Sequence, residues 1–387
     1  MRPFKIFLKT DLFRSKVCGG LDFTYDECNI NIETFRYQFD TMLGTQRKVT
    51  IKEVAAEANV AVSTVSLVIN QKGYVSEATR TRVEAATEKL SFVPSNAARQ
   101  LISRKTGNIG FVTRSDHFVR NEPFYTQIFL GTEFEARNQN HYILLSTIPS
   151  PYSPGTDTPR FLRERNVDGI LIAGRVDPLF ITETTDAGIP VVLVDFEYSG
   201  LPAVIIDNQT GTREAVDYLI AKGRVHIAFL GAEMDHPSME ARLEGFRLAI
   251  SKAAEIRDIE SEILVVDGEP DHVAGQKLSM QLFSLDPFPT AVFCVNDAIA
   301  FSVLEMAAER GIVIPDELAV IGFDDVPRSS RSVPPLTTIR VYKEQLGELA
   351  LRYLSELLQD NAENSGSFDR GSHSIQIPAE LILRESA

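Results

Sequence analysis

The spacing of apolar residues predicts two short helices joined by a tight turn between residues 50 and 70. Thr50 can cap the first helix, with Glu53 at the reciprocal position of a capping box. Asn59-Val60 would form the turn, and the second helix would cover 62–70. Such a pair is typical of a helix-turn-helix, whose second helix presents its N-terminal side chains to the DNA major groove. The positions that would be buried are Val54, Ala55, Ala58, Val65, Val68 and Ile69.

A pair of short Ala- and Val-rich helices is more often ordinary core, so the polar residues of the second helix need to be considered as well. Ser63, Thr64 and Ser66 are poor helix formers, yet they cluster at the start of the second helix. Small hydroxyl groups there can reach phosphates and base edges. A third helix would be capped by Ser76 and end near Leu90. These residues strengthen the case for DNA binding, and an ordinary structural pair stays open as the alternative at this point.

Beyond Gly107 the pattern changes to continuous β-branched runs separated by helical stretches. Such runs are typical of parallel strands that are covered on both faces. About ten strands would be wide for one such sheet, so we expect two doubly wound lobes with a ligand between them, at the carboxyl ends of the strands. The runs are 108–113, 142–147, 168–173, 190–195, 203–207, 226–231, 262–266, 290–295, 318–323 and 337–341.

Charge is divided unevenly along the chain, whose 387 residues carry a net charge of −14. Residues 46–106 hold 10 Lys and Arg against 5 acidic residues, whereas residues 107–387 hold 23 against 42. A basic module on an acidic body indicates that only the module contacts a polyanion, although a solvated surface bias would give the same numbers. Residues 1–45 are balanced at 6 against 6 and show no sustained periodicity.

Several classes of protein are disfavoured by what the sequence lacks. The three cysteines and six histidines show no disulfide framework, catalytic triad or metal-ligand spacing, so we expect no metal, no cofactor and no enzymatic activity. Cys294 lies in an apolar run and is expected to be buried. Charged residues interrupt the N-terminal apolar segment, and no run is long enough to span a membrane, so a cytoplasmic location is expected.

The run from Thr50 to Leu101 resembles the headpiece of the LacI/GalR (lactose-repressor) family of bacterial regulators. The motifs that carry the likeness are TIKEVA, VSTVSLVIN, YVSEATRTRV and FVPSNAARQL, in the family's order. The likeness covers residues 48–386. It implies an N-terminal all-α helix-turn-helix headpiece and an α/β core of two lobes, each a doubly wound parallel sheet, as in periplasmic binding proteins. The implied domains are the headpiece 48–93, a hinge helix and linker 94–106, and an effector-binding and dimerisation core 107–387, after an extension 1–45.

The resemblance assigns DNA contacts to the second helix and to the hinge. Val62, Ser63 and Leu67 would read bases, and Leu67 replaces a residue that is commonly polar, so it would pack on a thymine methyl instead of bonding a guanine. Residues 95–101 resemble a hinge helix that enters the minor groove and wedges a leucine into a base step, with a plain linker as the alternative. The expected DNA-contacting residues are Thr50, Val62, Ser63, Thr64, Ser66, Leu67, Asn70, Ala98, Arg99 and Leu101.

The resemblance also places effector contacts in a cleft between the lobes. Aromatic rings suit the apolar face of a sugar or base, and carboxylates, an amide and an arginine suit a polyhydroxyl ligand. We therefore expect a sugar or sugar derivative. Pro270 stands where relatives often have an aromatic residue, and Asp297 and Asp325 are expected to be structural. The expected effector-binding residues are Phe124, Tyr125, Asp195, His236, Ser238, Arg242, Asn296 and Asp324.

The family pattern implies a homodimer that binds a palindromic double-stranded DNA operator and responds to its ligand, with repression as the default. Its chain crosses between lobes three times, which we expect near 206–208, near Arg340 and within 361–373. Residues 1–41 are interpreted as an extension from a misassigned start codon, Met42 being the expected start, or as an accessory arm. The rival function is a solute-binding sugar receptor without regulatory role, which would share the lobes but not the headpiece.

Overall fold

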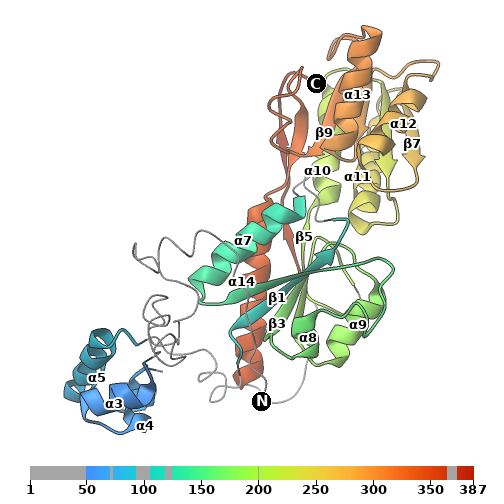
Figure 1. Ribbon diagram of the computed structural model, residues 1–387. Coiled ribbons are helices and arrows are strands. Elements are labelled where there is room, and N and C mark those ends of the chain that lie inside the picture. Colours follow the sequence, from blue (N-terminus) through green and yellow to red (C-terminus); the bar gives the residue numbers. More distant parts are fainter. Residues whose placement is uncertain (1–48, 70–72, 93–104, 118–123, 199, 364–372) are drawn as a thin grey trace, which may run out of the picture. The chain divides into compact units, whose positions relative to one another are not determined.

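The computed structural model describes residues 49–69, 73–92, 105–117, 124–198, 200–363 and 373–387, and the chain divides into two units at Ser95/Asn96 (Figure 1). Several predicted features lie outside the described residues. They are the N-terminal extension with Met42, the DNA-contacting residues Asn70, Ala98, Arg99 and Leu101, and nearly all of the expected hinge.

The headpiece consists of three helices, α3 (Ile51–Ala58), α4 (Val62–Ile69) and α5 (Glu77–Lys89). Its small core contains five of the six predicted apolar positions of the helix pair, while Ile69 is only partly buried. The backbone N–H of Thr50 donates to the Glu53 carboxylate at 2.7 Å, which is one half of the expected capping box. Asn59 ends α3 with a left-handed φ of 52°, which turns the chain toward α4.

Ser76 stands at the N-cap position of α5 but does not cap it through its side chain. Its hydroxyl lies 2.9 Å from the hydroxyl of Thr79 instead of accepting a backbone N–H. Ser76 therefore occupies the predicted N-cap position, but the predicted hydrogen bond from its side chain to the helix backbone is absent. The acidic Glu77 in the first turn and Lys89 in the last turn both complement the helix dipole.

The core contains two six-stranded sheets, which confirms the predicted two lobes but adds two strands to the ten that were predicted. The first has the order β11-β5-β4-β3-β1-β2 and is parallel throughout. The second has the order β12-β10-β9-β8-β6-β7, and only its edge strand β12 is antiparallel. The strands are β1 (Asn108–Arg114), β2 (Tyr142–Ile148), β3 (Gly169–Ala173), β4 (Val191–Val194), β5 (Ala203–Ile206), β6 (His226–Ala232), β7 (Glu260–Val266), β8 (Ala291–Cys294), β9 (Ala319–Asp324), β10 (Thr337–Arg340), β11 (Ser374–Ile377) and β12 (Glu380–Ile382).

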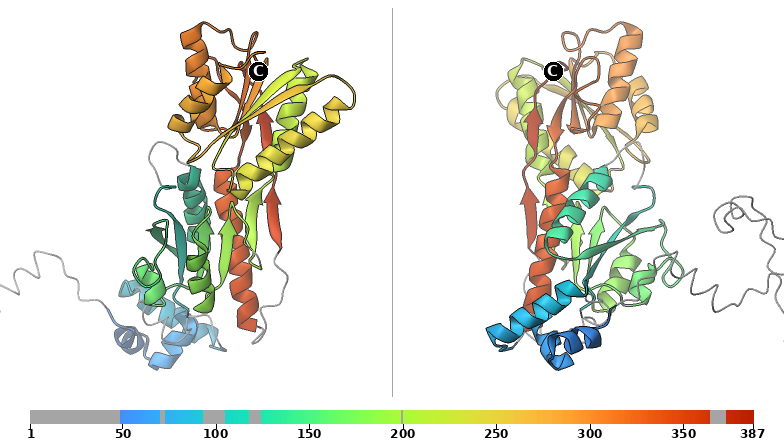
Figure 2. Two further views of the ribbon diagram at one scale, coloured as in Figure 1. Left: turned by 90° about the vertical axis from the view of Figure 1, so that its right-hand side faces the viewer. Right: turned by 60° about the vertical axis from the view of Figure 1, so that its left-hand side comes forward.

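Helices cover both faces of each sheet, which is why the central strands are apolar throughout. We call the part of the core built on the first sheet lobe 1 and the part built on the second sheet lobe 2. In lobe 1, α7 and α14 pack together over one face of the sheet while α8 and α9 cover the other (Figures 1 and 2). The lobe 1 helices are α7 (Phe124–Asn138), α8 (Arg160–Arg163), α9 (Pro178–Asp186) and α14 (Lys343–Glu363). The lobe 2 helices are α10 (Asn208–Ala221), α11 (Pro237–Ala254), α12 (His272–Leu282) and α13 (Asp297–Arg310). Within the described ranges, no helix is both long and apolar enough to cross a membrane.

The chain passes between the lobes three times, and one predicted crossing was misplaced. The first lies at Asp207, between β5 and α10, and the second lies between β10 and α14, as expected. The third was predicted within 361–373, but both α14 and β11 belong to lobe 1. The crossing lies instead at 378–379, between β11 of the first sheet and β12 of the second. These two short strands were absent from the ten predicted runs.

Candidate functional site

All eight predicted effector residues line one cavity of about 450 Å³ between the two lobes. This volume lies within the usual range for small-molecule sites. The residues come from the carboxyl ends of strands and from the first two turns of the helices that follow them, as expected for doubly wound sheets. The sequence prediction missed further lining residues, which are Asp116, His117, Glu233, Met239, Asp271, Glu269 and His272.

One wall of the cavity is aromatic. The rings of His117 and Tyr125 stack with centroids 4.8 Å apart, and Phe124 meets Tyr125 edge to face at 5.1 Å. Gly174 permits this stack, because a Cβ there would lie 2.6 Å from the His117 ring and 2.7 Å from the Tyr125 ring. Its φ of 74° also favours glycine. This wall offers flat apolar surface to a ligand.

Asp195 forms the deep acidic end of the cavity. The Tyr125 hydroxyl donates to its carboxylate at 3.0 Å, and the Ser238 hydroxyl donates to its backbone carbonyl at 3.2 Å. Burial raises the pKa of Asp195 to about 7, against the lowering influence of Arg242. His236 caps α11 by accepting the backbone N–H of Ser238 at 3.2 Å, and burial lowers its pKa to about 3, so its imidazole is neutral.

Arg242 is the cationic centre of the cavity and is only 2% exposed. Its Nε donates to the Asn208 side chain at 2.8 Å, and a terminal nitrogen donates to the carbonyl of Val295. Its other terminal nitrogen lies 3.5 Å from Asp324, and the guanidinium lies 3.6 Å above the Phe323 ring. Burial lowers its pKa, which the facing carboxylates oppose. Arg242 therefore holds lobe 2 together as well as facing the ligand space.

Asn296 reaches the cavity with its amide group largely committed to the protein. Its side-chain oxygen accepts the backbone N–H of Ile299 at 3.0 Å as the cap of α13, and its nitrogen donates to the carbonyl of Pro270 at 2.5 Å. The Asn296 amide therefore keeps one N–H donor and one acceptor lone pair for a ligand. Pro270 itself also lines the cavity.

The two aspartates expected to be structural make only internal contacts. Asp297 accepts from the Val326 backbone at 2.9 Å and from the Ser329 hydroxyl at 2.6 Å, and burial raises its pKa to about 7. Asp325 bonds Arg340 at 2.7 Å and Arg384 at 2.6 Å. Neither lines the cavity, in contrast to Asp324.

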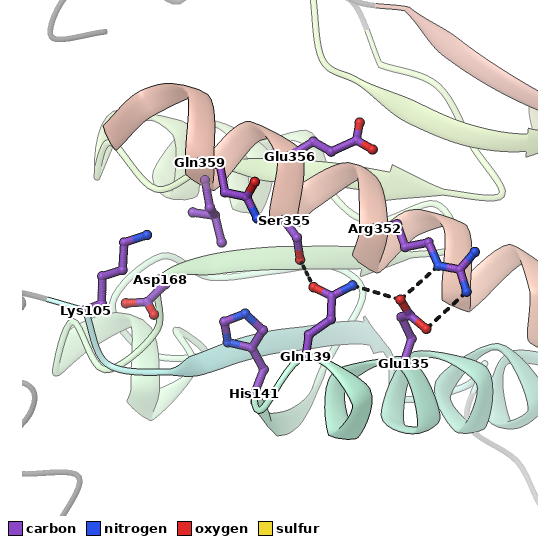
Figure 3. Close-up of a pocket in the computed structure, with 10 residues that line it drawn as sticks. Lys105, Glu135, Gln139, His141, Asp168, Arg352, Ser355, Glu356 and Gln359 are labelled. Atoms are coloured by element: carbon purple, nitrogen blue, oxygen red, sulfur yellow. Dashed lines mark hydrogen bonds and ion pairs between the residues drawn. The ribbon is translucent and has the colours of Figure 1, made fainter. Parts of the chain in front are cut away.

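Lobe 1 has a second, polar hollow between α7 and α14 (Figure 3). There Arg352 bonds Glu135 at 2.8 and 3.2 Å, and Glu135 in turn accepts from Gln139 at 2.8 Å. Because these groups form hydrogen bonds and an ion pair mainly with one another, the hollow resembles an inter-helix contact more than a ligand site. Asp168, at its rim, accepts the backbone N–H groups of Thr106 at 2.6 Å and Gly107 at 2.8 Å.

The second headpiece helix exposes the side chains that were predicted to read bases. Val62 and Leu67 are 40% and 39% exposed, and Ser63 is exposed between them in sequence. Thr64 and Ser66 are half-buried, and Thr50 is exposed at the start of α3. Val65 and Val68 face the small core instead. Val62, Ser63 and Leu67 are therefore solvent-accessible on α4 and free of the headpiece core.

Two family models match the chain. Residues 50–95 match "Bacterial regulatory proteins, lacI family", and residues 216–387 match "Periplasmic binding protein-like domain". The chain is 32% identical over 325 residues to the HTH-type transcriptional repressor PurR of Vibrio atlanticus, covering 83% of this chain and 95% of that protein. It is 29% identical over 340 residues to the repressor CytR of Escherichia coli, covering 87% and 96%.

Solved structures give the same picture. The lac repressor dimer bound to operator and the anti-inducer ONPF aligns with 28% identity and a TM-score of 0.70, over 88% of this chain and 99% of that chain. The complex of the transcriptional regulator CelR with cellobiose aligns with 27% identity and a TM-score of 0.63, over 88% and 100%. The likeness thus extends over the headpiece and both lobes.

Proposed function

The chain belongs to the LacI family of bacterial regulatory proteins, and from this premise we propose that it is a cytoplasmic transcriptional repressor whose affinity for an operator responds to a small polyhydroxyl ligand. The observation that carries the proposal is the presence in one chain of a basic helix-turn-helix and of a cavity lined by all eight expected effector residues. A solute-binding receptor would account for the cavity but not for the headpiece.

The α4 helix would enter the major groove with Val62, Ser63 and Leu67 toward the bases. Ser63 can donate to or accept from a base edge, whereas the two apolar side chains can contact thymine methyl groups. Thr50 and Ser66 would contact phosphates or hold the turn, which fixes the register of the protein on DNA. Asn70 and the hinge residues keep the roles that the resemblance assigns to them.

A homodimer is supported by exposed apolar side chains along one edge of each sheet. Strands β2 and β7 are the terminal strands of their sheets, and α7 and α12 lie beside them in the fold. An apolar surface of this kind marks an interaction site more often than free surface. A two-fold interface would also match the symmetry of a palindromic operator. The exposed side chains are Leu130, Phe134, Tyr142, Leu145, Ile263, Val265, Val273 and Met280.

A sugar or sugar derivative fits the chemistry of the cavity. The stacked His117 and Tyr125 rings suit the apolar face of a pyranose, and Asp195, Asp324 and Arg242 offer the charged hydrogen-bonding groups that hydroxyls pair with. The CelR complex with cellobiose is an example of a related regulator with a sugar ligand. Binding of ligand and DNA would be reciprocally linked, so a ligand that weakens operator affinity must itself bind less tightly to the operator complex.

The test is a selection of genomic DNA fragments by the purified full chain, with and without an extract of cell metabolites. We expect enrichment of one palindrome, in at least one of the two conditions. A Ser63→Glu variant should lose it, because a carboxylate would be placed against the DNA in an otherwise folded headpiece. Enrichment in neither condition would refute the regulator and favour the receptor. A change in operator affinity on adding extract would then allow the ligand to be fractionated.

A further inference from the structure

Three side chains that can ligate a metal meet at the edge of the effector cavity. They are His117, which follows β1 of lobe 1, and Glu233 and Glu269, which follow β6 and β7 of lobe 2. One ligand atom from each lies within 4.8 Å of those from the other two. No short sequence motif marks this cluster, because its members are separated by more than thirty residues and meet only in the fold.

The cluster holds more negative than positive charge. Arg114 lies 3.5 Å from Oε1 of Glu233 and 2.9 Å from Oε1 of Glu269, and it also pairs with Asp116. Three carboxylates around one guanidinium leave two negative charges when all are ionised. A divalent cation would neutralise this excess.

The imidazole of His117 has a nitrogen without a hydrogen-bond partner among the described residues, and its ring is held in position. This nitrogen, Nδ1, is buried. The stack on Tyr125 holds the ring in place. A positioned imidazole beside two carboxylates is a donor set that suits Mn²⁺, Fe²⁺ or Zn²⁺.

We propose that His117, Glu233 and Glu269 bind one divalent first-row metal ion that links the two lobes. Metal bonds of about 2.1 Å set two ligands of one ion at most about 4.2 Å apart, so a pair at the 4.8 Å limit of this cluster must approach by at least about 0.6 Å. Because the ligands belong to both lobes, the ion would bind the closed arrangement more tightly than an open one and so favour closure. The three ligands also line the effector cavity, so the ion and the effector would occupy neighbouring parts of one cleft.

The experiment is a titration of the chelator-treated full chain with Mn²⁺ alone. The concentration of free Mn²⁺ is measured by electron paramagnetic resonance at each addition. Mn²⁺ is the probe because carboxylate and imidazole ligands suit it, whereas thiolates of the three cysteines prefer softer metals. We expect one ion per chain. Glu269→Gln and His117→Ala should each weaken binding at least tenfold. Glu214→Gln and His373→Ala, at exposed positions away from the cluster, are the matched controls and should bind as the unaltered chain does.

Two outcomes would overturn the proposal. One is the absence of binding at millimolar Mn²⁺, and the other is binding that the cluster variants leave unchanged. Glu269 is exposed, so its glutamine variant should fold even if a substitution of His117 disturbs the aromatic stack. Since no DNA or effector is present in this titration, its failure would leave the proposed regulatory function untouched.

Discussion

Replacing Asp195 with asparagine should flatten the dependence of the core's stability on pH. Asp195 is 5% exposed, and burial raises its pKa from 3.8 to about 7. The folded protein therefore binds this proton more tightly than the unfolded chain does. The stability that results is fully present below about pH 4 and is lost as the pH rises through about 7. Asparagine cannot ionise, and it tolerates the left-handed φ of 67° at this position.

The size of the effect follows from the two pKa values. Between pH 5 and pH 8 the unfolded carboxyl is ionised throughout, whereas the buried one ionises only near the upper end. The free energy of unfolding falls by about 3 kcal/mol over this interval because of Asp195 alone. For a domain of this size that is a fall in Tm of about 5 °C. Asp297 has a similarly raised pKa but remains in both proteins, so its contribution cancels in the comparison.

The assay is thermal unfolding of the full chain and of Asp195→Asn at intervals between pH 5 and pH 8. The unaltered chain should lose about 5 °C more than the variant over that interval. Asp186→Asn, at an exposed position on α9, serves as the matched control and should follow the unaltered chain. If Asp195→Asn and the unaltered chain give parallel profiles, Asp195 is not an uncompensated buried acid and the reasoning fails.

Two further predictions concern the connection between headpiece and core. Asp168→Ala removes the acceptor of two backbone N–H groups, so amide exchange at Thr106 and Gly107 should accelerate at least tenfold, as measured by hydrogen exchange; unchanged protection there would mean that the strand itself holds this segment. Leu101→Ala should weaken operator binding roughly ten- to hundredfold yet leave binding to unrelated DNA unchanged, and equal losses in a gel-shift titration of both would contradict the hinge assignment.

The fold was predictable because its strands are long apolar runs and its helices are amphipathic. All ten predicted runs form strands, and they form the two expected lobes. Strands β11 and β12 escaped prediction because they are short edge strands whose residues are mostly exposed, so no apolar run marks them. The third crossing was misplaced for the same reason, since a Gly/Ser-rich stretch suggested a linker where the chain returns to the same sheet.

The site was predictable where the resemblance supplied positions, and less so where it did not. Asp195 and Arg242 were found in this way. His117, Glu233 and Glu269 were missed, although the rule that ligands gather at the carboxyl ends of parallel strands points to the positions after β1, β6 and β7. The double commitment of the Asn296 amide could not be inferred, because it depends on the distant carbonyl of Pro270. Such partners depend on packing, not on local sequence.

The late position of β11 and β12 bears on how the chain folds during synthesis. Each is an edge strand of a different lobe, and Ser386 lies buried against Val320 and Thr337 of lobe 2. Neither lobe can finish its sheet until the ribosome has passed residue 374, whereas the headpiece is contiguous and has a core of its own. At about 5–20 residues per second the delay is some tens of seconds. A nascent chain would therefore carry a folded headpiece, with its α4 helix formed, well before its lobes could bind a ligand or pair with a second copy.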